Sequence, residues 1–159
     1  MTKPWLSLAI VVGLLFTLLA PAWADYQAGV DAYERGDYET ALKEWRPLAN
    51  QGLAVAQNNL GWMYDQGEGV AQDYQEAVRW FRLAAEQGYA LAQSNLGAMY
   101  ANGLGVRQNY VQAYMWATLA SSQNVELAVK WKDFLVKEMT PAQLAEAQRL
   151  AREWTPKGK

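Results

Sequence analysis

The side chains that could carry chemistry here are carboxylates, lysines, tyrosines and serines, because the sequence contains neither Cys nor His. The lack of Cys excludes thiol nucleophiles, thiolate metal sites and disulfides. The lack of His removes the commonest general base near neutral pH and the commonest transition-metal ligand. A hydrolase that uses two carboxylates roughly 5–9 Å apart remains open. Asp65 and Glu68 are the candidate pair for that chemistry.

Composition narrows the class of protein further. The 159 residues carry a formal net charge of −2 at pH 7, which argues against a nucleic-acid binder because such proteins usually present a basic face. Eight Trp and nine Tyr are many for this length. Large aromatic side chains of this kind can hold a small stack of helices together.

The first 24 residues resemble a secretory signal. Lys3 precedes an almost wholly apolar stretch over residues 6–19, Pro21 then interrupts it, and small residues stand before Asp25. The alternative is an uncleaved membrane anchor, but an apolar run of about 14 residues is short of the roughly 20 that a spanning helix needs. We therefore predict cleavage between Ala24 and Asp25, a periplasmic or secreted protein, and no membrane span after cleavage.

An internal repeat dominates the rest of the chain. Residues 53–88 and 89–124 align without a gap, with 18 identical positions in 36. The shared positions, by their numbers in the first copy, are Ala54, Ala56, Gln57, Asn59, Leu60, Gly61, Met63, Tyr64, Gly67, Gly69, Val70, Gln72, Tyr74, Ala77, Trp80, Leu83, Ala84 and Gln87.

Each copy is predicted to form a helix, a loop and a second helix. Apolar residues at spacings of three and four predict helices over about 54–65 and 74–87. Glycines between them suit a turn, and Asp73 can cap the second helix. Gly61 lies inside the first helix, where Gly costs roughly 1 kcal/mol relative to Ala. Its recurrence as Gly97 predicts that a facing helix approaches closely there.

Two further segments flank the repeats. Residues 25–52 form a degenerate first unit whose shorter interhelix spacing is typical of a tetratricopeptide repeat. Residues 125–159 predict two more helices, and Thr140 with Gln143 forms a capping-box pattern at the start of the last one. A terminal helix with one polar face would close the open end of a helical stack.

The pattern Ala-x-Ala-Gln-x-x-Leu-Gly-x-x-Tyr, then Gly-x-Gly-Val, then Ala-x-x-Trp and a closing Ala resembles the Sel1-like repeat, a relative of the tetratricopeptide repeat. It occurs over residues 54–84 and 90–120. The resemblance implies an all-α protein, an α-solenoid of helix-loop-helix Sel1-like repeats with a C-terminal capping helix, which acts as an adaptor or scaffold. Disulfide-linked properties of Cys-rich relatives do not carry over to a chain without Cys.

The resemblance also implies where a partner binds. In tetratricopeptide-like stacks, the first helix of each pair lines the concave face. The residues predicted to face this groove are Tyr33, Glu34, Asn58, Trp62, Asp65, Gln66, Ser94, Ala98 and Asn102. Trp62 is distinctive because its equivalent in the next repeat is Ala98, and a Trp in a groove is a typical binding anchor. The alternative is that it fills a gap between neighbouring units.

Three functions remain in competition. The leading one is a non-enzymatic adaptor or scaffold in the cell envelope that binds another envelope protein or a peptide. The second is a peptidoglycan- or glycan-binding protein, since aromatic side chains beside Asn and Asp also suit sugars. The carboxylate enzyme ranks last, because Glu68 is Leu104 in the next repeat. We predict no catalytic residues, cofactor or metal, and no nucleic-acid partner.

Overall fold

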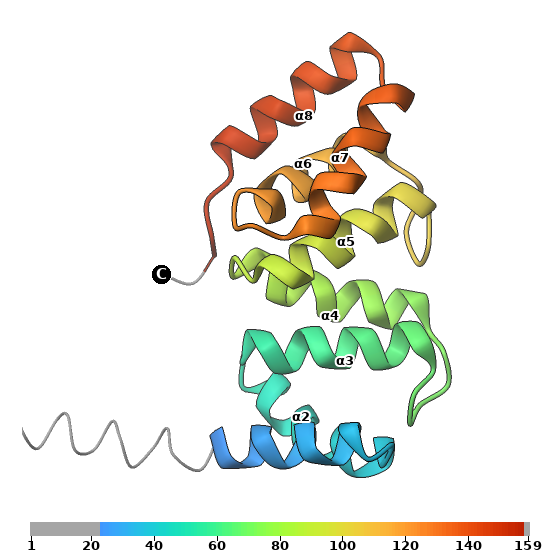
Figure 1. The fold of residues 1–159 in the computed structure, drawn as a ribbon, viewed down its shortest axis with the longest axis vertical. Helices are drawn as coiled ribbons and strands as arrows, with labels where there is room; N and C mark the ends of the chain where they lie inside the picture. Colours follow the sequence, from blue (N-terminus) through green and yellow to red (C-terminus); the bar gives the residue numbers. More distant parts are fainter. Residues whose placement is uncertain (1–22, 158–159) are drawn as a thin grey trace, which may run out of the picture.

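The computed structural model describes residues 23–157, and this part of the chain consists of helices joined by short loops, without strands. Figure 1 shows the helices stacked in chain order along the long axis of the molecule. After a helix whose described part covers residues 23–34, the elements are α2 (Tyr38–Asn50), α3 (Ala54–Gln66), α4 (Tyr74–Glu86), α5 (Ala90–Asn102), α6 (Tyr110–Ser121), α7 (Glu126–Glu138) and α8 (Pro141–Glu153). The predicted all-α solenoid is confirmed. Residues 1–22 of the predicted signal segment lie outside the part of the chain that the structure describes.

Side-chain caps and glycines determine where the repeat helices begin and end. The Asp73 carboxylate accepts hydrogen bonds from the backbone N–H groups of Gln75 and Glu76, which have no partner within α4. α3 and α5 both end at a glycine in the left-handed conformation, Gly67 and Gly103, with φ of 74° and 68°. A residue with a side chain adopts that conformation only at a cost, so both repeats keep Gly there.

The glycines inside the first helices mark close helix contacts, as their recurrence predicted. A Cβ atom added at Gly61 would lie 2.6 Å from Cδ1 of Phe81 on α4. At Gly97 the nearest atom would be the backbone carbonyl oxygen of Ala113 on α6, at 3.2 Å. The absence of a side chain therefore lets α3 and α4, and likewise α5 and α6, pack closely.

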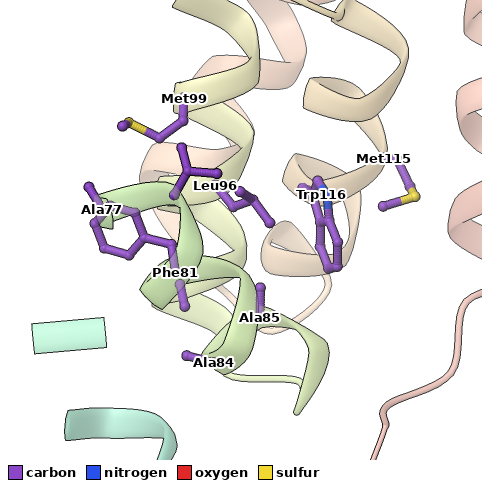
Figure 2. Packing of buried hydrophobic residues seen from close by; sticks show 10 residues of the cluster. Ala77, Phe81, Ala84, Ala85, Leu96, Met99, Met115 and Trp116 are labelled. Carbon is purple, nitrogen blue, oxygen red and sulfur yellow. The ribbon is translucent and has the colours of Figure 1, made fainter. Parts of the chain in front are cut away.

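The central core lies where α4, α5 and α6 meet. Phe81 and Leu96 are among its largest fully buried side chains, and Met99 and Trp116 pack in the same cluster. Figure 2 shows these side chains converging from three helices. Burying large apolar side chains contributes about 1.5–3 kcal/mol each, so this cluster binds the two repeats into one unit.

Buried glutamines connect successive repeats through hydrogen bonds. The Gln93 side chain donates to the carbonyl of Ala85 at 3.2 Å and accepts from the Gln123 side chain at 3.0 Å. One repeat earlier, Gln57 donates to a carbonyl of α2 and accepts from Gln87 at 2.7 Å. A buried amide without partners would be costly, so this spacing of 30 residues, which recurs in both pairs, serves stability.

The two C-terminal helices do not pack against each other as the two helices of a repeat do. The Thr140 hydroxyl accepts from the Gln143 backbone N–H, and the Gln143 side chain accepts from the Thr140 N–H, which confirms the predicted capping box. α8 packs against α6, as α7 also does, and does not form a paired hairpin with α7. Trp154 then contacts Trp116 edge to face, and the Lys157 backbone N–H donates to the Glu86 carbonyl at 2.7 Å.

This arrangement leaves part of α7 uncovered. Only Ala128 and Leu135 of α7 are buried, whereas Leu127 and Phe134 remain 54% and 45% exposed. The second helix of a pair would normally cover its own first helix. Because α8 lies along α6, the apolar side chains of α7 stay partly open to solvent.

Candidate partner-binding groove on the first-helix face

A depression of about 420 Å³ lies between the helix over residues 23–34 and α3, and we call it the first depression. It is lined by Tyr26, Val30, Tyr33, Glu34, Trp45, Asn58, Asn59 and Trp62. Seven of these eight residues come from the first helices of the first two units. Most of its lining side chains are aromatic, and its polar side-chain groups include two amides, one carboxylate and two tyrosine hydroxyls.

Trp45 of α2 forms the floor of the first depression. Its indole N–H donates to the backbone carbonyl of Tyr26 at 3.1 Å, and its ring lies 6.1 Å from that of Tyr26 and 5.6 Å from that of Tyr33. A Cβ atom at Gly29 would overlap the Trp45 indole, so only Gly lets the helix over residues 23–34 lie against it. Trp45 is 3% exposed, so its side chain lies almost wholly beneath the surface.

A hydrogen-bonded chain connects the first two units at the edge of this depression. The Trp62 indole N–H donates to the Tyr33 hydroxyl at 3.1 Å, and that hydroxyl donates to Oε2 of Glu68 at 2.7 Å. Burial, together with the Glu68 carboxylate, raises the pKa of Tyr33 to about 12. The hydroxyl therefore stays protonated at neutral pH and holds both partners in place.

A second depression, of about 260 Å³, adjoins the first. It is lined by Trp62, Asp65, Phe81, Asn95, Ala98, Met99, Asn102, Leu104, Leu127 and Trp131. Trp62 belongs to both linings and is 42% exposed, so one indole separates the two depressions. We use "groove" for the two depressions together.

The structure brings most of the predicted groove residues together. Tyr33, Glu34, Asn58 and Trp62 line the first depression. In the second depression the predicted lining residues are Trp62, Asp65, Ala98 and Asn102. Whether these residues bind a partner stays a prediction.

Two predicted residues lie elsewhere. Ser94 is 3% exposed, lines neither depression, and has a hydroxyl with no hydrogen-bond partner within the described part of the chain. Gln66 is exposed at the end of α3, where it donates to the Asp65 carboxylate at 2.5 Å, and it also lines neither depression. The equivalent of Ser94 in the preceding repeat, Asn58, does line the first depression.

Sequence reasoning also missed lining residues. Tyr26 and Val30 stand seven and three positions before Tyr33, so helical periodicity would have placed them on the same face. Leu127 and Trp131 of α7 also line the second depression. That placement depends on how α7 packs beyond the last repeat, for which the repeat pattern carries no signal.

The candidate catalytic carboxylates are engaged in structural contacts. Glu68 accepts from the Tyr33 hydroxyl, and Asp65 accepts from Gln66. Across residues 23–157, no group of three or more Asp or Glu side chains is arranged to hold a metal ion. Within the same range, no helix has the length and apolar character needed to cross a bilayer.

These features define the class: an α-solenoid of stacked helix pairs whose first helices line an aromatic groove. The chain contains two Sel1 repeats, over residues 54–89 and 90–125, which confirms the resemblance to the Sel1-like repeat family. Sel1-repeat proteins are typically protein-interaction scaffolds rather than enzymes.

Several solved structures resemble this one, among them the following two. A protective antigen present in uropathogenic Escherichia coli strains, which displays an SLR fold, has a TM-score of 0.80 and 35% identity, covering 84% of this chain and 29% of its own. A Sel1 repeat protein from Oxalobacter formigenes has a TM-score of 0.67 and 33% identity, covering 82% of this chain and 56% of its own. This chain thus spans less than two thirds of either relative. None of the curated proteins compared matches it.

Proposed function

We propose that this protein is an exported, non-enzymatic adaptor that binds another envelope protein, or a peptide segment of one, in the groove. The single observation that carries the proposal is Trp62, a large aromatic side chain left 42% exposed at the junction of two depressions. Exposed aromatic residues in concave sites are typical anchors of protein interfaces. The two Sel1 repeats support a protein partner.

Trp62 is held ready for such contacts. Its indole N–H is already bonded to Tyr33, so its orientation is fixed before a partner arrives. A side chain that is ordered in the free protein loses little conformational entropy on binding. The same hydrogen bond also joins the first two units, so Trp62 combines interrepeat contact with an exposed binding surface.

A crosslinked pull-down from envelope extract tests the proposal. We expect the wild-type protein to capture one recurrent protein, and Trp62→Ala to lose it while keeping its helical circular dichroism. Leu91→Ala is the matched control, because Leu91 is 50% exposed on α5 but lines neither depression. Capture that survives Trp62→Ala but not Leu91→Ala would contradict the assignment of the groove.

Peptidoglycan or another glycan is the second candidate ligand, favoured by the aromatic walls beside Asn58 and Asn59. The test is whether the protein sediments with purified cell wall. If it does, and if Trp62→Ala abolishes the sedimentation, the ligand of the groove is a glycan and not a protein.

Export follows from the N-terminal segment and is tested separately. The protein recovered from the periplasm or medium should have an intact mass that begins at Asp25. A mass that includes residues 1–24 would contradict cleavage there.

A further inference from the structure

We propose that the first depression recognises a cationic side chain, arginine or lysine, carried by a peptide segment of the partner. This inference rests on the proposed function and adds the chemistry of the ligand. Three features of the depression support it: its mostly aromatic lining, its only formal charge, and the internal hydrogen bonds that its amide and hydroxyl groups already make.

The lining of the first depression is mostly aromatic. Tyr26, Tyr33, Trp45 and Trp62 belong to it, and the Trp62 side chain is 42% exposed. The face of an aromatic ring carries partial negative charge and attracts a cation placed over it. The molecule already contains such a contact elsewhere, where the Arg79 guanidinium lies 4.0 Å from the Trp80 ring centroid. A depression of about 420 Å³ has room for one long side chain and the adjoining backbone.

The charges around the groove are acidic. Glu34 is the only charged residue that lines the first depression, and Asp65 is the only one that lines the second. No Lys or Arg lines either depression. Among the described residues the Glu34 carboxylate forms no ion pair, and Glu68 lies directly behind the Tyr33 hydroxyl. A positively charged ligand would therefore be attracted to the first depression, and no basic side chain in its lining would repel it.

Each amide that lines the first depression already makes one hydrogen bond within the protein. Oδ1 of Asn58 accepts from Asn95 at 3.1 Å, and Nδ2 of Asn59 donates to the Tyr26 hydroxyl at 3.4 Å. The Tyr33 hydroxyl accepts from the Trp62 indole N–H and donates to the Glu68 carboxylate. Breaking these bonds would leave buried polar groups without partners, which disfavours a ligand that relies on them. A cation uses the aromatic faces and the Glu34 carboxylate and leaves the internal bonds intact.

The test compares peptides that differ only in charge. The probes are acetyl-Ala-Ala-Xaa-Ala-Ala-amide with Xaa as arginine or citrulline, which has nearly the same shape without the charge. Binding is followed by NMR on the purified ¹⁵N-labelled protein through the Trp62 indole N–H signal, which is assigned as the signal missing from Trp62→Phe. We expect the arginine peptide to shift this signal and to bind about tenfold more tightly than the citrulline peptide.

Glu34→Gln tests the same point from the protein side. Glu34 is exposed and makes no ion pair within the described residues, so this variant should fold as the wild type does. This variant should bind the arginine peptide several-fold more weakly than the wild type does, and it should bind the citrulline peptide with the same affinity as the wild type. Equal affinity for the two peptides, or no shift at millimolar arginine peptide, would overturn the inference. A peptidoglycan fragment that shifts Trp62 when the arginine peptide does not would also overturn it.

The pull-down separates this inference from the proposed function. If a protein is captured through Trp62 but the arginine peptide does not bind, the adaptor stands and the cationic ligand is wrong. If capture does not depend on Trp62 and the peptide does not bind, both are wrong.

Discussion

Replacing Gly61 with Ala should destabilise the protein by about 1–2 kcal/mol, although Ala is the better helix former. The substitution gains roughly 1 kcal/mol of helix propensity. Against this, the new Cβ would lie 2.6 Å from Cδ1 of Phe81, which is only 1% exposed and enclosed by the core. Overpacking of this kind typically costs 1–3 kcal/mol, and the ring cannot move aside, so we take about 2–3 kcal/mol here.

Gly97→Ala is the matched control in the next repeat. There the nearest atom would be the Ala113 carbonyl oxygen at 3.2 Å, so a shift of a few tenths of an ångström relieves the contact. The expected cost of about 1 kcal/mol cancels the gain in helix propensity. The two equivalent glycines should thus respond differently, because Phe81 in one repeat is replaced by Ala117 in the other.

Urea unfolding followed by circular dichroism measures these free energies. Phe81→Leu should destabilise on its own by leaving a cavity, but it should also make room for the methyl group of Gly61→Ala. We expect the double variant to be more stable than the sum of the single effects by at least about 1 kcal/mol. The reasoning is refuted if Gly61→Ala is as stable as the wild type, or if the two substitutions are additive.

Three further predictions concern polar contacts. Gln93→Leu should cost about 1–3 kcal/mol in the free energy of unfolding by urea, because it removes the two hydrogen bonds that the fully buried Gln93 amide makes, one to the Ala85 carbonyl and one with the Gln123 side chain; an unchanged midpoint would contradict this. Thr140→Ala should lower stability by about 1 kcal/mol through loss of the α8 cap, and Thr140→Ser should largely restore it. Because Tyr33 has its pKa raised in the folded state to about 12, its contribution to stability should be complete below pH 10 and fall between about pH 10 and 12; Tyr33→Phe should remove this part of the pH dependence of urea unfolding.

Local signals in the sequence are sufficient to predict where the helices of the two repeats begin and end. The 36-residue identity, the glycines after each first helix and the cap at Asp73 predicted helices whose ends differ from the observed ones by about one residue. The interactions behind these signals form within one helical turn or between adjacent helices. They can therefore be predicted from a sequence pattern that recurs in both repeats. The close approach at Gly61 was predictable for the same reason.

The candidate groove was only partly predictable. Residues on the first helices follow from periodicity, and this placed Glu34, Trp62 and Asp65 where the structure has them. Ser94 occupies the same repeat position as Asn58, yet it is 3% exposed and lines neither depression. The internal hydrogen bonds of Asn58 also required the structure, since its partner Asn95 comes from the next repeat.

The sequence by itself determined the helix pairs, their caps, and the face that the aromatic residues share, because those features depend on neighbours within one repeat. The tertiary structure alone decided that α8 packs on α6 and leaves α7 partly exposed. It also decided that Trp62 stands between two depressions. The physical reason is that the C-terminal segment lacks the repeat pattern, so only the packing of large side chains across units, such as Trp154 on Trp116, selects its position.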